Sequence, residues 1–376
     1  MSLLTVTNVS HGFGARQILE NASFRLLKGE HIGLVGANGE GKSTFLNIIT
    51  GKIKPDEGNI AWSRHVSVGY LDQHSVLEKG ADNILFTDSG TSAIRAAVKS
   101  FIKPGDHVIS TDGEHRAVLD ALAEACSAGS RVTFIPLNEY GVLRYDLIEK
   151  AIEPDTRAII CCHGSALTGN VTDLERVGAI ARKHGLMVIA DGTQTAGAVP
   201  VNLEELQTDV FCFSGHKKLM GPAGTGGICL GDGFAADHGI SEGIRCPSRQ
   251  KLGQLKASVD FILEKGIYGV SIFPHRLAKR FFESVRSMKD VTVYGDFGTN
   301  TRVPTVSLNI RGFTPDEIKE HMRKNHIAIS SGDCSCPRLT ESLGIGKEGV
   351  ARFSFGYFNT RMDVNDAIWA LMELQG

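Results

Sequence analysis

The sequence predicts an α/β protein with a mostly parallel sheet covered by helices on both faces, a smaller C-terminal α+β domain and a partial phosphate-loop lobe at the N-terminus. Three observations support this fold class. Strand-length apolar segments alternate with helix-length segments over residues 84–214, as in sheets built from βαβ units. A loop-rich stretch at 231–253 is followed by strands and helices without that alternation. A GxxxxGK[ST] loop at 36–43 stands between an apolar strand and a helix.

Residues 1–80 form the first predicted domain, a partial nucleotide-binding lobe. Short apolar segments at 4–9 and 31–35 predict strands, and the second leads into the glycine-rich loop. A helix is expected from residue 42 to about residue 51, and a hairpin-like stretch ends at 66–71.

Residues 81–253 form the second predicted domain, which contains the parallel sheet. Its apolar runs are short and bounded by turn residues, which is typical of buried strands, and amphipathic segments lie between them. The predicted strands are 84–87, 107–111, 132–136, 158–162, 187–191 and 210–214, and the predicted helices are 89–102, 116–128 and 174–184.

Residues 254–376 form the third predicted domain, in which strands and helices do not alternate regularly. In chain order we expect a helix at 255–263, strands at 291–294 and 305–310, a helix at 315–324, a strand ending at 352–356 and a last helix at 364–373.

Composition and charge limit the classes of partner. Hydrophobic residues make up 42% of the 376 residues and charged residues 22%, as in ordinary soluble domains. The net charge of −2 and the lack of like-charge blocks argue against nucleic acid or a membrane surface as a partner. No apolar run reaches the about 18 residues of a membrane span, and the first residues do not resemble a signal peptide, so we expect a cytoplasmic protein. The eight cysteines are too sparse for a disulfide scaffold and are expected to be thiols.

The first candidate site is the glycine-rich loop that precedes Lys42. Main-chain N–H groups of such a loop converge on phosphate, Lys42 adds a positive charge, and Ser43 could ligate Mg²⁺. The segments GEHIGLVGANGEGKSTFLNIITG and GYLDQ resemble the nucleotide-binding domain of ABC ATPases, most closely the ABC-F class. The resemblance implies that Gln73 is the Q-loop glutamine and that Phe13 stacks on adenine. The implied nucleotide-binding residues are Phe13, Gly36, Asn38, Gly39, Gly41, Lys42, Ser43, Thr44 and Gln73.

This ABC resemblance covers about the first 80 residues. The LSGGQ signature, the apolar run ending in Asp-Glu and the switch histidine of a complete ABC domain do not follow it. We therefore expect ATP with Mg²⁺ to be bound weakly if at all, and not to be turned over.

The second candidate site centres on the motif Ser-Gly-His-Lys that ends at Lys217. It closes the apolar strand DVFCF and precedes the turn GPAGTGG. From Ala81 onward the sequence resembles class V aminotransferases of the pyridoxal 5'-phosphate (PLP) fold type I, particularly the cysteine desulfurase family. The resemblance implies that Lys217 is the Schiff-base lysine, and a lysine among apolar groups is a usable amine nucleophile. Taken alone, Lys217 and Lys218 would be interpreted as an exposed basic pair.

Other residues extend this cofactor site. Asp191 ends the strand LMVIAD, where ligands of parallel sheets gather, and its carboxylate can keep the pyridine nitrogen of PLP protonated. A helix N-cap is the alternative role for Asp191. The resemblance implies that Gln194 bonds the cofactor phenolate and that His115 stacks on the ring and shuttles protons; a solvated loop histidine is the alternative. A phosphate cradle is expected at a helix start. The cofactor-binding set is Gly90, Thr91, Ser92, His115, Asp191, Gln194, Ser214, His216 and Lys217.

Substrate-handling residues come from the C-terminal domain. The resemblance implies that Arg352, in VARFSFGYFNT, binds the substrate α-carboxylate, which suits its fork of donors; a surface ion pair is the alternative. The segment SGDCSCP matches the loop that carries the reactive cysteine of desulfurases, with the family's cysteine falling on Ser335 between Cys334 and Cys336. In an extended loop both thiols point away from the Ser335 side. The charge of Asp333 disfavours a Cys334 thiolate, so Cys336 is slightly favoured. A zinc or redox pair is the alternative.

Four departures from the family pattern alter the substrate pocket but not the lysine loop. The family's N-terminal segment is replaced by the ABC-like lobe, with the transition near Gly80. Ala166 stands where the family usually has asparagine, and Ser330 replaces a usual arginine. The stretch 231–253 lacks the GTxN motif by which a second subunit reaches the PLP phosphate. The resemblance therefore implies PLP binding and leaves impaired turnover open.

The leading hypothesis is a PLP-dependent cysteine desulfurase that converts L-cysteine to L-alanine and an enzyme persulfide, with Lys217, His115 and either Cys334 or Cys336 as catalytic residues. Aminotransferase or selenocysteine lyase chemistry is a near alternative, and an ATP-binding ABC-F-like module or an inactive fused scaffold is a more distant one. The implied partners are a small amino-acid substrate, a sulfur-acceptor protein and a second copy of the chain in a homodimer.

Overall fold

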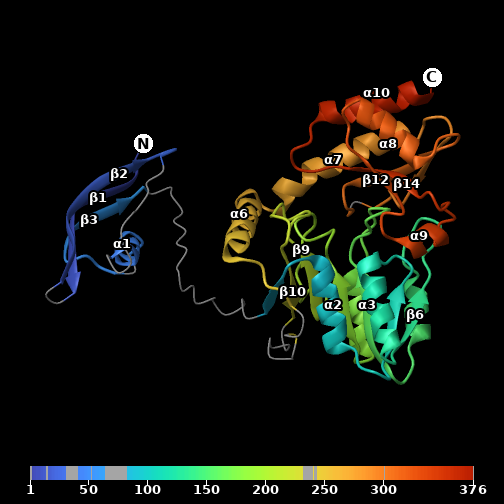
Figure 1. The fold of residues 1–376 in the computed structure, drawn as a ribbon, viewed down its shortest axis with the longest axis horizontal. Coiled ribbons are helices and arrows are strands. Elements are labelled where there is room, and N and C mark those ends of the chain that lie inside the picture. Colours follow the sequence, from blue (N-terminus) through green and yellow to red (C-terminus); the bar gives the residue numbers. More distant parts are fainter. Residues whose placement is uncertain are drawn as a thin grey trace. The chain divides into compact units, whose positions relative to one another are not determined.

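The computed structural model describes residues 2–13, 16–30, 41–51, 53–63, 83–231, 240, 244–299 and 301–375. The chain divides into two compact units, Met1–Leu77 and Glu78–Gly376, and each is described by itself (Figure 1).

The N-terminal unit is a three-stranded antiparallel sheet of order β2-β1-β3, accompanied by one described helix. Leu4, Val6 and Val9 from the first strand form its small core with Ile48 from the helix. The predicted strand at 4–9 lies inside β1, and the predicted helix corresponds to α1, whereas the strand at 31–35 and the stretch at 66–71 fall outside the described residues. The elements are β1 (Ser2–Phe13), β2 (Arg16–Leu27), α1 (Lys42–Ile49) and β3 (Glu57–Trp62).

A seven-stranded sheet forms the centre of the second unit, with the order β4-β10-β9-β8-β7-β5-β6. Only β10 runs antiparallel to its neighbours within this sheet, so the predicted α/β fold with a mostly parallel sheet is confirmed. Its strands are β4 (Ile84–Thr87), β5 (His107–Thr111), β6 (Arg131–Ile135), β7 (Thr156–Cys162), β8 (Met187–Asp191), β9 (Val210–Ser214) and β10 (Gly226–Leu230).

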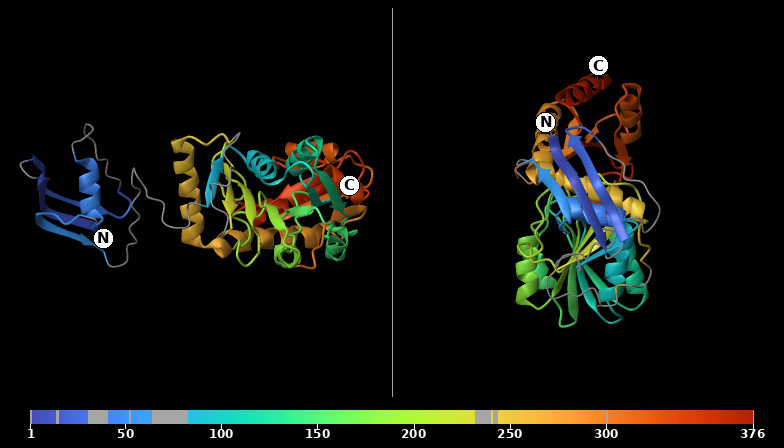
Figure 2. Two further views of the ribbon diagram at one scale, coloured as in Figure 1. Left: turned by 90° about the horizontal axis from the view of Figure 1, so that it is seen from below. Right: turned by 90° about the vertical axis from the view of Figure 1, so that its left-hand side faces the viewer.

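Helices cover both faces of this sheet (Figure 2). The first core packs α2 and α3 against one face through small apolar residues such as Ala93 and Ala97. The second core packs α5 against the other face through Leu174, Val177 and Ala181. The helices are α2 (Gly90–Phe101), α3 (Arg116–Ser127), α4 (Tyr145–Ile148) and α5 (Leu174–Lys183), and a 3-10 turn follows α4 at Glu149–Ala151.

The C-terminal part contains an antiparallel sheet of order β11-β12-β14-β13, packed against α7, α8 and α10 (Figure 1). The domain boundary predicted at residue 253 lies inside α6. The elements are α6 (Arg249–Lys265), α7 (Ile267–Val285), β11 (Val291–Tyr294), β12 (Thr305–Ile310), α8 (Pro315–Lys324), β13 (Ser330–Gly332), α9 (Pro337–Ser342), β14 (Val350–Ser354) and α10 (Arg361–Gln375).

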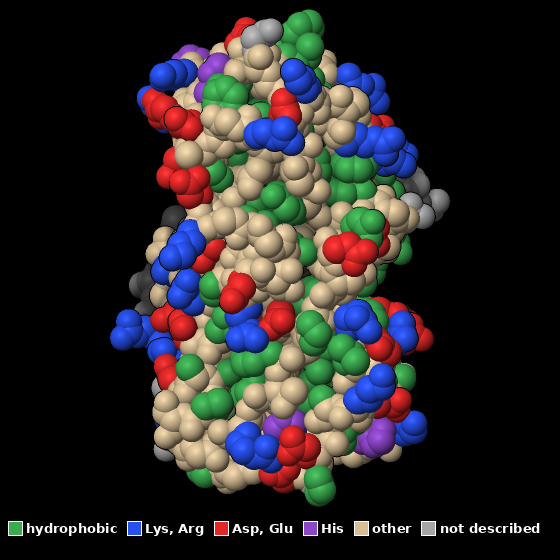
Figure 3. Space-filling model, turned by 90° about the vertical axis from the view of Figure 1, so that its right-hand side faces the viewer, with side chains coloured by type: hydrophobic (Ala, Val, Ile, Leu, Met, Phe, Trp, Pro, Cys, Tyr) green, Lys and Arg blue, Asp and Glu red, His purple; other side chains and the backbone are tan. Residues whose placement is uncertain are grey.

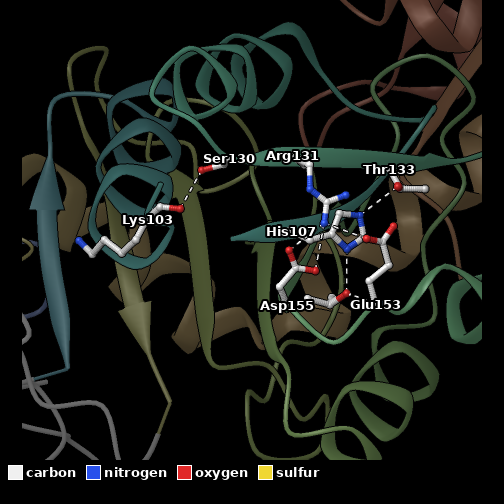
Figure 4. A network of polar contacts seen from close by, with 8 residues as sticks. Lys103, His107, Ser130, Arg131, Thr133, Glu153 and Asp155 are labelled. Atoms are coloured by element: carbon white, nitrogen blue, oxygen red, sulfur yellow. Dashed lines mark hydrogen bonds and ion pairs between the residues drawn. The ribbon is translucent and has the colours of Figure 1, made fainter. Parts of the chain in front are cut away.

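A polar network ties three strands together at the edge of the sheet where β5 begins (Figure 4). The buried ring of His107 contacts the hydroxyl of Thr156 at 2.7 Å and that of Thr133 at 2.9 Å. Arg131 donates to the carboxylates of Glu153 and Asp155, each at 2.8 Å. Both ring nitrogens and the guanidinium already have hydrogen-bond partners. We therefore interpret this cluster as structural, because it connects β5, β6 and β7.

Basic and acidic side chains are interspersed on the face seen in Figure 3, and neither sign of charge dominates it. This agrees with the net charge of −2. Among the helices that the structure describes, none has the length and apolar character needed to cross a bilayer.

Candidate functional site

The predicted cofactor residues gather at the carboxyl ends of adjacent parallel strands. Asp191 is the last residue of β8 and Ser214 the last of β9. His115 caps the start of α3 just after β5, and its Nδ1 accepts a hydrogen bond from the Ala117 N–H at 3.1 Å. The sheet order places these ends side by side, which is where ligands of open α/β sheets bind.

Lys217 lines two neighbouring cavities at this edge. The larger has a volume of about 490 Å³ and is also lined by His115, Gln194 and Arg352. The smaller is shared by Lys217, His115, Gln194 and Asp191. Four residues that the sequence placed in one site therefore meet around one space.

Burial lowers the pKa values of two of these residues, Lys217 and His115. It lowers the pKa of Lys217, and the carboxylate of Asp191 opposes that shift. It also lowers the pKa of His115, again opposed by Asp191, so the imidazole favours its neutral form and can accept a proton. Asp191 is 6% exposed, and its Oδ1 accepts a hydrogen bond from the Thr193 N–H at 2.9 Å, which fixes the carboxylate at the end of β8.

The predicted phosphate cradle lies at the start of α2. The hydroxyl of Ser89 caps the helix by accepting from the Ser92 N–H at 3.1 Å, and the N–H groups of the first turn have no partner within a helix. A Cβ at Gly90 would lie 2.8 Å from Thr193 Oγ1, so the glycine permits the close approach of these elements. Thr193 is a cradle neighbour that sequence reasoning missed.

Two further observations concern the cradle. Ser214 Oγ lies 3.0 Å from His216 Nδ1, which leaves His216, itself exposed, hydrogen-bonded at the rim. The hydroxyl of Ser92 donates to Asp88 Oδ1 at 2.5 Å, so this side chain is occupied by a carboxylate. Both hydroxyls are already hydrogen-bonded, so the main-chain N–H groups at the start of α2 fit a phosphate better than these side chains do.

Arg352 is anchored at the wall of the larger cavity. Its Nη1 donates to the carbonyl of Ala166 at 3.0 Å and its Nη2 to Ser330 Oγ at 3.2 Å. Its buried Nε has no hydrogen-bond partner among the described residues, and none of their carboxylates forms an ion pair with it. Ala166 and Ser330, two of the positions that depart from the family pattern, thus hold the guanidinium in place. The guanidinium keeps the capacity to bind a ligand carboxylate.

The cysteine loop is not extended, which corrects the reasoning from alternation. Cys334 and Ser335 have φ angles of 52° and 59°, in the left-handed region. Both residues line the larger cavity instead of facing opposite sides. Cys336 is 1% exposed, packs with Leu167 and Leu339, and only reaches the wall of the smaller cavity.

Burial and nearby charges affect the pKa values of the two thiols to different degrees. Burial raises the pKa of Cys336 strongly, which keeps it a thiol. Burial also raises the pKa of Cys334. The guanidinium of Arg352 opposes this shift by charge and by a hydrogen bond, whereas the charge of Asp333 adds to it, as the sequence predicted. The sequence slightly favoured Cys336 as the acting thiol, and its buried position does not support that prediction. The geometry favours Cys334, which lines the larger cavity.

Comparison with known proteins places this site in a family. Residues 75–235 and 247–366 match the family described as Aminotransferase class-V. The chain belongs to the class V aminotransferase family. Class V relatives include a probable cysteine desulfurase of Halalkalibacterium halodurans, 25% identical over 312 residues that cover 76% of this chain and 75% of the relative. Cysteine desulfurase IscS of Vibrio vulnificus is 29% identical over 306 residues, which cover 75% of this chain and 73% of the relative.

Solved structures support the class V fold. The apo structure of a cysteine desulfurase from Thermococcus onnurineus has a TM-score of 0.71 at 24% identity and covers 78% of this chain and 79% of that chain. The cysteine desulfurase CsdA of Escherichia coli gives a TM-score of 0.70 at 23% identity, with the same coverages of 78% and 79%.

A second similarity covers most of the N-terminal unit and extends beyond it. Residues 19–125 match the family described as ABC transporter. An uncharacterized ABC transporter ATP-binding protein, YfmM of Bacillus subtilis, is 72% identical over 80 residues, which cover 21% of this chain. The matched residues span 15% of the length of that relative.

The predicted nucleotide residues are described only in part. Gly41 has a φ of 86° at the start of α1, a conformation that suits glycine, and Lys42 and Thr44 lie in the first turn of that helix. Gly36, Asn38, Gly39 and Gln73 lie outside the described residues, as do the side chains of Phe13 and Ser43.

Glu114, which adjoins His115, is a buried acid that the sequence analysis did not single out. Its Oε1 accepts hydrogen bonds from the Thr111 hydroxyl and from the Cys162 N–H, and its Oε2 has no partner among the described residues. Burial raises the pKa of Glu114 to about 8, and the nearby carboxylate of Asp191 adds to the shift. Glu114 is therefore mainly protonated near neutral pH, and Asp191 does not face a second full negative charge.

Glu114 is expected to make the folded unit less stable as pH rises. The unfolded chain loses this proton near its ordinary pKa of 4.5, while the folded protein keeps it until about 8. The folded state binds more protons between these values, so the stabilisation is complete below 4.5 and is lost as pH rises through 8. The slope from one such group is up to about 1.4 kcal/mol per pH unit.

Glu114→Gln, which has no proton to lose, should flatten this part of the pH dependence. Chemical denaturation between about pH 5.5 and about pH 7.5 measures the free energy of unfolding. Glu139→Gln, at an exposed turn residue, should leave the slope unchanged. An equal slope in wild type and Glu114→Gln would contradict the assignment.

Proposed function

We propose that the chain is a PLP-dependent enzyme of the cysteine desulfurase type, which converts L-cysteine to L-alanine and leaves the sulfur as a persulfide on a protein cysteine. The observation that carries this proposal is the convergence of Lys217, His115, Asp191 and Arg352 on adjoining cavities at the carboxyl edge of the sheet. The named activity of the class V relatives supports the choice of substrate.

Each residue has a role that its surroundings suit. PLP, when bound, supplies an electron sink for bonds at the substrate Cα. Lys217, with its lowered pKa, offers the amine that holds the cofactor, and Asp191 offers the carboxylate for the pyridine nitrogen. The neutral imidazole of His115 can take a proton, and Arg352 can bind the α-carboxylate.

The sulfur acceptor in this proposal is Cys334. Its thiol lines the cavity together with Arg352 and Lys217. The substrate C–S bond breaks, the Cys334 sulfur bonds to the released sulfur, and the carbon is protonated to give alanine. Reduction at carbon balances oxidation at sulfur, so no outside oxidant is required.

The experiment is to load the full chain with PLP and to assay L-cysteine. Bound cofactor should colour the protein, borohydride should bleach the colour, and L-alanine should form in step with persulfide. A protein that takes up no PLP would refute the proposal, while PLP uptake with alternative amino-acid products would assign another class V chemistry. A homodimer and a sulfur-acceptor protein are further expectations of this proposal.

A second candidate function is nucleotide binding by the N-terminal unit, favoured by its 72% identity to an ABC ATP-binding protein. If the unit binds ATP with Mg²⁺, a ligand concentration of a hundred times Kd should stabilise it by about 2.7 kcal/mol. Parallel thermal unfolding with ATP and with PLP measures both ligands on the same chain. No shift with ATP, with Lys42→Ala behaving as wild type, would argue against this function.

A further inference from the structure

A second lysine stands beside the cofactor lysine and has no obvious structural role. Lys218 lines the larger cavity together with Lys217 and Arg352. Its Nζ makes one long hydrogen bond, 3.4 Å to the carbonyl of Phe355. Within the described part of the chain no carboxylate forms an ion pair with it. A partly buried ammonium without a counter-ion is costly unless a ligand supplies one.

The lining of this cavity is strongly one-sided in charge. None of the nine described residues that line it is acidic, and three of them carry basic groups in addition to His115. Two acids beside this cavity interact with other groups, because Asp191 lines the smaller cavity with Lys217 and Asp333 pairs with Arg116 at 3.3 Å. Neither therefore neutralises Lys218.

The charges can be matched to an amino-acid ligand one at a time. Lys217 is assigned to the cofactor, and Arg352 takes one carboxylate. Lys218 then remains as an extra cation in the same space. Burial, followed by the positive charges of Arg352 and Lys217, lowers the pKa of Lys218 to about 8, and a bound anion would relieve both effects.

We propose that this cavity prefers amino acids that carry a second oxyanion on the side chain, with Arg352 on the α-carboxylate and Lys218 on the side-chain anion. The inference rests on the proposed function only in assigning Arg352 to the α-carboxylate. Lys218 is then a specificity-determining residue, and acidic amino acids such as L-aspartate compete with L-cysteine for the site.

The test compares two unreactive ligands of nearly equal shape, succinate and its monoamide succinamate, by calorimetric titration of the full chain with and without PLP. We expect wild type to bind succinate at least tenfold more tightly than succinamate. Lys218→Met should bind the two ligands equally, with succinamate affinity unchanged, and Lys218→Arg should keep the preference. Lys319→Met, the same charge change on the exposed side of α8, is the matched control and should behave as wild type.

Several results would overturn the inference. One is a wild-type protein without preference for the dianion, and another is a preference that survives in Lys218→Met. Loss of PLP binding in Lys218→Met with the succinate preference intact would assign the lysine to the cofactor instead. Failure of the proposed function is distinguishable, because it appears as absent PLP absorbance in wild type while the succinate titration without PLP still reports on Lys218.

Discussion

Replacing Lys217 by alanine is expected to abolish the visible absorbance of protein-bound PLP and to lower alanine formation from L-cysteine by about 10²- to 10⁴-fold, the range for loss of a positioned proton-transfer group. In the proposed function Lys217 supplies the covalent link to the cofactor, and burial lowers the pKa of its amine. Absorbance after PLP loading and alanine release are the two measurements.

The control for this prediction is Lys319→Ala. This lysine is exposed on α8, so the variant removes the same charge without touching the cavity. It should bind PLP as wild type does. A Lys217→Ala protein that keeps a borohydride-sensitive colour would show that another lysine, with Lys218 the first to examine, holds the cofactor.

Replacing Cys334 by alanine is expected to lower persulfide formation by about two orders of magnitude, the effect expected when the acting nucleophile of a site is removed. Cys334 lines the cavity next to Arg352, whose charge favours the thiolate. Cys336→Ala should keep most of the activity, because that thiol is buried and its pKa is strongly raised. Alanine is preferred to serine at 336, since a buried hydroxyl without a partner costs roughly 1–3 kcal/mol.

Persulfide on the protein, measured by alkylation and mass determination after incubation with L-cysteine, separates the two thiols. Exposed Cys126 on α3 provides the matched control, and Cys126→Ala should be fully active. Full activity in Cys334→Ala and loss in Cys336→Ala would reverse the assignment. Full activity in both would place the sulfur acceptor elsewhere.

The seven-stranded sheet was largely predictable because its strands are short, apolar and separated by amphipathic helices. The strand predicted at 187–191 coincides with β8, and the one at 210–214 with β9. Helix α7 was missed because Gly269 and Pro274 interrupt the helical pattern, although packing against the four-stranded sheet stabilises it. Strand β10 was missed because it opens with two glycines. A Cβ at Gly226 would lie 2.5 Å from the Ser89 carbonyl carbon, so glycine is required there for packing.

The candidate site was likewise predictable in part. Motif and position along the strands predicted one site for Lys217, Asp191 and His115, and these three residues line the same small cavity. Sequence spacing could not distinguish Cys334 from Cys336, because left-handed backbone at residues 334 and 335 reverses the expected directions. The pKa shifts of Glu114 and Lys218 depend on burial and on which charges the described residues place nearby, and one-dimensional patterns do not show either.

The order of strands in the large sheet also affects how the chain is made. β4 is the first strand of this sheet to leave the ribosome, yet its described partner is β10, the last. More than a hundred residues separate Thr87 from Gly226, and at about 5–20 residues per second their synthesis takes on the order of ten seconds. During that interval β4 lacks its strand partner β10, although residues 1–77 have already been synthesised. Nascent chains should therefore engage chaperones over this interval and be released from them once β10 has been translated.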